Sequence, residues 1–173
     1  FGRGHGQRFA DQVREIAEAR VSTWEPGQRL RLRDEMEAIS FDSIMRVVFN
    51  DESADRHERL RELIPEMMDR CDSPFTLIPW FRKSLAGLSP YARLMKVVHQ
   101  VDEALYDAIE ERRADPLVQL RDDVLSLLLR AGHEDGTALQ DREIRDELLT
   151  LIMAGYETTT SGLAWSFERL LRS

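Results

Sequence analysis

The segment Leu148–Leu171, "LLTLIMAGYETTTSGLAWSFERLL", decides the fold of this chain, because it is long, mainly apolar and free of proline. Asp141 or Gln140 is a suitable start for a helix, so the sequence predicts one helix from about there to Leu171. At its centre stands Ala154–Thr159, "AGYETT", with a glycine, a carboxylate and two threonines. Those residues are unusual at the middle of a packed helix, and they direct attention to this segment as a functional site.

Further helices separated by short breakers are predicted along the rest of the chain. Apolar residues recur at helical spacing in five earlier stretches, which are residues 8–23, 34–49, 54–70, 90–113 and 122–131. Asp34 is expected to cap the second of these, and Pro65 to disturb the third. The alternating Arg29–Leu32, "RLRL", predicts a short strand. The expected fold is all-α with at most one short strand, in a single piece over residues 1–173.

Composition limits the partners. The 173 residues carry a net charge of -8, whereas a nucleic-acid surface needs clustered Lys and Arg that are not outnumbered by acids. No apolar run reaches the roughly 20 residues of a membrane helix, and the start lacks the apolar region of a signal peptide. The single cysteine, Cys71, fits a reducing compartment. We therefore expect a cytoplasmic protein that binds neither nucleic acid nor membrane.

Other motifs do not point to a site. The opening "GRGHG" lacks the third glycine of a dinucleotide fingerprint, because Gln7 stands in its place. The four histidines form no pair with ligand spacing, and the acidic "HEDGTALQD" lacks the regular oxygen ligands of a calcium loop. The sequence therefore predicts no metal site.

The central hexapeptide combines three features that suggest chemistry. A glycine inside a helix, such as Gly155, costs about 1 kcal/mol relative to alanine, so something must usually approach the backbone closely there. The Thr158 hydroxyl can bond back to the Ala154 carbonyl or turn toward a ligand. A buried Glu157 carboxylate would suit a proton relay. The alternative is structural, with small residues that let helices pack tightly and Glu157 as an ordinary ion-pair partner.

"AGYETT" resembles the signature in the long central helix of cytochrome P450 haem-thiolate monooxygenases, which reads Ala/Gly-Gly-x-Asp/Glu-Thr-Thr/Ser. Average residue usage makes a chance match in a chain of this size about one in a thousand. Residues 27–51, 88–115 and 122–149 are similar to elements that precede this helix in the family. The resemblance therefore covers nearly the whole chain.

The resemblance implies a mainly helical fold, a haem cofactor, and insertion of one oxygen atom from dioxygen into a small organic substrate. It also implies an electron-transfer partner, either a ferredoxin or a flavoprotein reductase. Ala154 and Gly155 match residues that lie against the haem and the oxygen pocket. Thr158 matches the threonine that steadies bound oxygen and its protons, and Glu157 the acid that helps deliver them. Thr158 and Glu157 are thus the expected catalytic residues, and Ala154, Gly155 and Thr158 the expected cofactor contacts.

Cys71 does not match the family's haem ligand. That cysteine lies in Phe-x-x-Gly-x-x-x-Cys-x-Gly, and the flanking positions here hold Ile64, Met67 and Ser73. We therefore expect the chain to be the middle portion of such an enzyme, without the N-terminal part and the C-terminal part that carries the ligand. Alone it is expected to bind no haem and to be inactive. The alternative is a self-contained α-helical ligand-binding or interaction module without catalysis.

The family's Glu-x-x-Arg motif is expected after the central helix. Glu58-x-x-Arg61 and Glu110-x-x-Arg113 both precede it, so we interpret them as ion pairs on helix surfaces.

Two regions are expected to contact the substrate. Residues 73–90, "SPFTLIPWFRKSLAGLSP", occupy the position of the family's substrate-access lid, where Phe75 and Ile78 supply apolar contact area. On a helical wheel, one sector of about 140° contains Thr150, Met153, Ala154, Glu157 and Thr158. In the family this sector faces the haem and the substrate, so the resemblance implies that it is partly open in the present chain, with Thr150 and Met153 available to the substrate. Leu149 and Ile152, on the opposite side, should pack on the preceding helices.

Overall fold

The computed structural model describes residues 3–50, 53–72 and 89–172, which form an all-helical assembly. The helices are α1 (Arg3–Val21), α2 (Leu32–Val48), α3 (Ala54–Cys71), α5 (Pro90–Ala114), the 3-10 helix η2 (Val118–Leu120), α6 (Val124–Arg130) and α7 (Asp141–Arg172). These ranges contain an isolated β-bridge between Gly132 and Ala138 and no strand. The predicted all-α class is confirmed.

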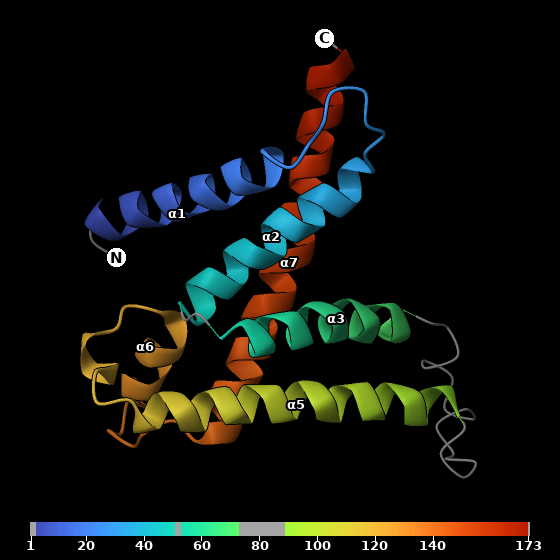
Figure 1. Cartoon of the computed structure of the whole chain (residues 1–173). Helices are drawn as coiled ribbons and strands as arrows, with labels where there is room; N and C mark the ends of the chain where they lie inside the picture. The colour runs from blue at the N-terminus through green and yellow to red at the C-terminus, as the bar shows by residue number, and fades with distance from the viewer. Residues whose placement is uncertain (1–2, 51–52, 73–88, 173) are drawn as a thin grey trace.

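The long helix α7 organises the arrangement. Figure 1 shows α7, in orange to red, passing behind α2, α3 and α5, while α3 and α5 lie side by side across it. Helix α2 makes the most extensive contact with α7, α1 lies against α2, and α6 lies near the start of α7. At 32 residues, α7 is about 48 Å long, so it reaches from the α5–α6 end of the structure past α2.

One hydrophobic core joins α2, α3, α5, α6 and α7. Its fully buried side chains include Phe41, Val48, Leu60, Ile64, Val101, Leu105, Ile109, Leu125, Ile144, Leu148 and Ile152. The buried residues of α7 recur every four positions, which is the spacing of one helix face. Only that face of α7 faces the core, so the opposite face is left for other contacts.

Polar contacts fix the start of α7. The backbone N–H of Gln140 donates to the Glu143 carboxylate at 2.8 Å, which satisfies a donor that the helix itself cannot bond. Arg113, at the end of α5, donates two hydrogen bonds to Asp141. Arg145 of α7 forms an ion pair with Asp102 of α5. These contacts set the crossing of α5 and α7.

The predicted strand at Arg29–Leu32 is wrong. Residues 28–31 have no regular secondary structure, and α2 begins at Leu32. An alternating sequence becomes a strand only where another strand takes up its hydrogen bonds, and the described residues offer none here. Asp34 is also not the cap, because Arg31 holds that position without a side-chain bond. Asp34 lies in the first turn, 3.6 Å from the Arg31 guanidinium.

Pro65 does not interrupt its helix, contrary to the prediction, because α3 is continuous from Ala54 to Cys71. A proline inside a helix costs about 3 kcal/mol, since it removes one hydrogen bond and crowds the preceding turn. Burying one Leu, Ile or Met side chain contributes about 1.5–3 kcal/mol. The flanking core residues of α3, which are Leu60, Leu63, Ile64 and Met67, together outweigh that cost.

Candidate functional site

The candidate site lies on the side of α7 that faces away from the core. Ile152 and Tyr156 are buried, whereas Ala154, Glu157 and Thr158 are exposed. Thr150, one turn earlier, is exposed too, and Met153 is half-buried where it packs against the edge of the core. The expectation that this sector is open is therefore confirmed. Leu149 and Ile152 pack against the core, also as expected.

The threonine hydroxyls on this face are bonded to their own helix. Thr158 Oγ1 donates to the Ala154 carbonyl at 2.5 Å, and Thr150 Oγ1 donates to the Asp146 carbonyl at 2.8 Å. Of the two arrangements considered for Thr158, the structure contains the back-bonded one. The helix is continuous through this turn, so the hydroxyl would have to exchange that bond to reach a ligand.

Gly155 faces α2 rather than the open side. A Cβ built on Gly155 would lie 2.7 Å from Cδ1 of Ile44 and 3.0 Å from its Cγ1, which is closer than ordinary van der Waals contact. The close approach that the glycine permits is therefore that of α2. The structural alternative explains this position, and the assignment of Gly155 to the haem pocket stays a prediction that the resemblance alone supports.

Glu157 is exposed, and this corrects the expectation of a buried carboxylate. The reason is geometric: Glu157 lies about 140° around the helix from Ile152, and the described residues do not cover that side. In this structure its carboxylate can exchange protons directly with solvent.

Tyr156 and its partners were missed by sequence reasoning. The Tyr156 ring meets the Phe41 ring of α2 edge to face, with 5.9 Å between centroids and 86° between planes. Burial raises the pKa of the Tyr156 phenol, and the Glu37 carboxylate raises it further. No local pattern links Phe41 or Ile44 to a helix more than a hundred residues later, so only the tertiary structure reveals these contacts.

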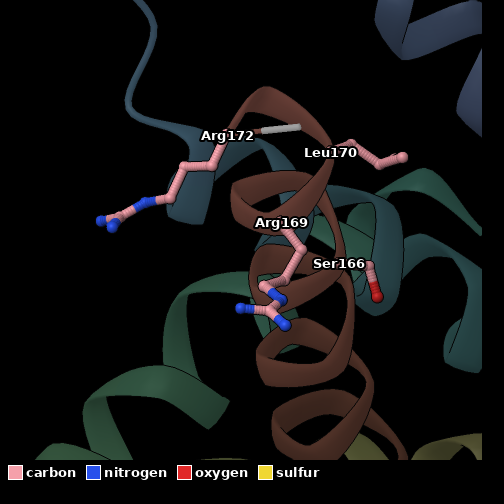
Figure 2. Close-up of a pocket in the computed structure, with 4 residues that line it drawn as sticks. All are labelled: Ser166, Arg169, Leu170 and Arg172. Carbon is pink, nitrogen blue, oxygen red and sulfur yellow. The ribbon is translucent and has the colours of Figure 1, made fainter.

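A hollow of about 610 Å³ lies at the C-terminal end of α7, about two turns or more beyond Thr158. It is lined by Ser166, Arg169, Leu170 and Arg172. Figure 2 shows Leu170 and Arg172 leaving the helix on opposite sides, so the hollow is an open surface around the helix end. None of the predicted site residues lines it, and we assign no function to it.

Cys71 has the properties of an ordinary thiol. It is the exposed last residue of α3, and local burial together with the Asp72 carboxylate raises the pKa of its thiol. A metal ligand needs the thiolate, which a raised pKa disfavours. Within the described ranges, no three His, Cys, Asp or Glu side chains are placed to hold a metal ion.

The remaining predicted positions have mixed outcomes. Phe75 and Ile78 lie outside the described residues, so their substrate role stays a prediction. The Glu58–Arg61 ion pair is present at 3.8 Å. The predicted Glu110–Arg113 pair is wrong, because Arg113 turns to Asp141 across the α5–α7 crossing.

The fold and the open face define a class of protein, namely an all-helical assembly whose longest helix leaves a stripe of small side chains uncovered. The family model for cytochrome P450 matches residues 3–173. Over 172 residues the chain is 34% identical to a Mycobacterium tuberculosis protein named cytochrome P450 135B1, covering 99% of this chain and 36% of the relative. A Mycobacterium bovis protein named cytochrome P450 138 is 38% identical over 152 residues, covering 88% and 34%. The chain belongs to the cytochrome P450 family.

Solved structures have the same fold as this chain. The crystal structure of the cytochrome P450DA heme domain matches with a TM-score of 0.73 and 28% identity, covering 94% of this chain and 35% of that one. A retinoic acid-bound cyanobacterial CYP120A1 has a TM-score of 0.71 at 20% identity, over 90% and 33%. The chain thus spans about a third of the length of these relatives. Among the helices described, none is both long and apolar enough to span a membrane.

Proposed function

We propose that this chain is the middle portion of a cytochrome P450 monooxygenase. The whole enzyme would bind haem and insert one oxygen atom from dioxygen into a small organic substrate. The observation that carries the proposal is the uncovered face of α7, where Ala154, Glu157 and Thr158 of the signature stand together in a chain whose family is established. A self-contained module is less favoured, because it would bury this face in its own core.

The residues on the open face fit a flat cofactor. Ala154 and Thr158 are small, lie one helical turn apart and leave space for a planar ring. Haem held by a thiolate would supply the iron chemistry that cleaves dioxygen. Cys71 does not fit as that ligand, so the thiolate must come from outside these 173 residues, and we propose that the chain alone is inactive.

Each residue of this face has a distinct proposed role. The Thr158 hydroxyl, released from the Ala154 carbonyl, would hold a proton donor in position beside the substrate pocket. The Glu157 carboxylate, which is open to solvent here, would pass protons inward. Thr150 and Met153 would contact the substrate on the same face, with Phe75 and Ile78 from the predicted lid.

We propose the same class of partners that the resemblance implies, namely an organic substrate, dioxygen, and a ferredoxin or flavoprotein reductase as electron donor. We propose a cytoplasmic location because the sequence contains only one cysteine, Cys71, which fits a reducing compartment.

The test compares adjacent threonines in the full-length protein. Thr158→Ala should keep the haem content but release reducing equivalents as peroxide or water, because the hydroxyl that orders the proton donor is gone. Thr159→Ala is the matched control, since Thr159 is exposed but points about 100° away around the helix. Glu157→Gln should slow oxygen consumption. Equal coupling in the Thr158 and Thr159 variants would contradict the assigned role.

A second experiment uses the isolated chain. Titration with haem, followed by reduction and addition of carbon monoxide, should give no thiolate-type spectrum. A thiolate-type spectrum would show that Cys71 is a ligand and would refute the proposed division of the enzyme.

A further inference from the structure

The signature turn is held on α2 by two neighbouring residues. Gly155 packs against Ile44 of α2, and Tyr156 meets Phe41, one turn earlier on the same helix. Phe41 is 2% exposed and Tyr156 is 8% exposed, so water does not separate the two rings. Two contacts one turn apart fix both the rotation and the axial position of α7 at this turn.

Phe41 is itself held from the other side by α3. The His57 ring meets Phe41 edge to face at 5.5 Å, and the Arg61 guanidinium lies over the Phe41 ring at 5.5 Å. Both side chains are fixed by Asp42: His57 Nε2 lies 2.8 Å from its carboxylate, and Arg61 forms an ion pair with it. The Phe41 ring is therefore clamped between α3 and Tyr156 of α7.

A hollow lies beside this clamp. A cavity of about 170 Å³ is lined by residues of α2, α3 and α7, among them Phe41, Arg61, Pro65 and Tyr156. On the side that faces this hollow, Tyr156 is not closely packed. The edge-to-face contact with Phe41 is thus one restraint on the ring, and the hollow offers space into which the ring can move when that contact is lost.

We infer that Tyr156, anchored on Phe41, is a positioning residue that sets the direction of Glu157 and Thr158. This inference rests on the proposed function and deepens it. The three residues share one helical turn, so any rotation that Tyr156 allows is passed on to Glu157 and Thr158. A rotation of about 10° moves an atom at the outer helix radius by about 1 Å. A displacement of that size in a reacting site can cost about a hundredfold in rate.

The experiment uses the full-length protein with four variants. Tyr156→Leu and Phe41→Leu remove the edge-to-face contact, and Tyr156→Phe keeps it. Phe49→Leu is the matched control, because Phe49, the C-cap residue of α2, is also a buried phenylalanine under an arginine, with the Arg56 guanidinium 5.6 Å from its ring centroid. Phe49 is not in ring contact with Tyr156, so it reports the cost of removing any buried ring from this core.

Four quantities are measured for each variant: thermal stability, haem content by the reduced carbon monoxide spectrum, product formed per reducing equivalent, and backbone amide exchange in residues 154–162. We expect Tyr156→Leu and Phe41→Leu to lower product per reducing equivalent about tenfold at unchanged haem content, with faster exchange in residues 154–162. Tyr156→Phe should restore both quantities. Phe49→Leu should lower thermal stability without changing either one.

The outcomes separate this inference from the proposed function. If Thr158→Ala uncouples the enzyme but Tyr156→Leu does not, the proposed function stands and the positioning role is overturned. If Phe49→Leu uncouples as strongly as Phe41→Leu, general loosening of the core explains the effect and the inference also falls. If the wild-type protein forms no haem complex, the proposed function fails. In that case amide exchange alone tests whether Tyr156 is anchored on Phe41. Equal exchange in the Tyr156→Leu and Phe49→Leu proteins would overturn that anchoring.

Discussion

The structure predicts opposite effects on stability for alanine substitutions at two glycines of α7. A Cβ added at Gly155 would collide with Ile44, whereas one added at Gly162 would meet nothing within 4 Å. Both positions lie inside the same helix, where alanine is favoured over glycine by about 0.5–1 kcal/mol. Gly162→Ala should therefore stabilise the protein by about that amount. Gly155→Ala gains the same propensity but has to displace Ile44.

The size of the difference follows from the contact distances. Ile44 Cδ1, at 2.7 Å from the added Cβ, is the end of a flexible side chain, but Cγ1 at 3.0 Å lies closer to the α2 backbone and has less freedom. Overpacking of this kind typically costs 1–3 kcal/mol. We expect Gly155→Ala to lower the free energy of unfolding by up to about 2 kcal/mol, and to differ from Gly162→Ala by about 1–3 kcal/mol.

A double-mutant cycle isolates the cause. Ile44→Ala removes Cδ1 and Cγ1 and leaves Cβ, which is 3.6 Å from the added atom and in ordinary contact. In that background Gly155→Ala should become stabilising by about 1 kcal/mol, so its effect changes sign. The assay is urea unfolding of the full-length protein, followed by far-UV circular dichroism. If Gly155→Ala stabilised the otherwise unchanged protein as Gly162→Ala does, the close α2–α7 approach would be refuted.

Two further predictions concern charges. Glu35 accepts hydrogen bonds from the Arg20 guanidinium and from the Trp24 indole N–H. These bonds hold the pKa of Glu35 below its ordinary value of about 4.3. The ionised Glu35 carboxylate therefore stabilises the fold fully when the pH is above this ordinary pKa. That stabilisation is lost as the pH falls through the lower pKa of Glu35 in the folded protein. Urea midpoints measured against pH should show this acid loss, and Glu35→Gln should reduce it. Arg112→Met leaves the buried Asp123 carboxylate without its ion pair and should lower the free energy of unfolding by about 3–5 kcal/mol. Arg113→Met removes an exposed ion pair with Asp141, so it should lower the free energy of unfolding by less than about 1 kcal/mol in the same assay.

The helices that were predicted well begin at residues with a local physical signal. Ser89 accepts a hydrogen bond from the Ala92 backbone N–H, and Pro90 follows it in the first helical position. Asp123 caps α6 in the same way, through the Ser126 N–H. Such signals involve residues two or three positions apart, so the sequence displays them directly.

The errors have tertiary causes. Arg29–Leu32 alternates as a strand does, yet no described neighbour pairs with it. Pro65 carries a local penalty that the buried residues on both sides of it outweigh. In both cases the deciding partner is distant in the sequence, and a local pattern contains no information about it.

For the candidate site, the helical period grouped Thr150, Met153, Ala154, Glu157 and Thr158 on one side of α7, and the resemblance to the family indicated that this side would be open. Period alone could not identify the partners of the buried side. Phe41 and Ile44 look like any other apolar residues of α2, and only the crossing of α2 and α7 places them beside Tyr156 and Gly155.

The signature therefore serves two faces of one helix, and its two small residues are small for different reasons. Ala154 lies on the open side, where a larger side chain would project toward whatever covers this face. Gly155 lies toward α2, where even a methyl group would reach Ile44. A six-residue helical stretch turns through more than one full circle, so its members cannot all point at a single ligand. Substitutions on the open side should act on chemistry at nearly constant stability. Those toward α2 act through the packing that aims the open side, and they change stability and chemistry together.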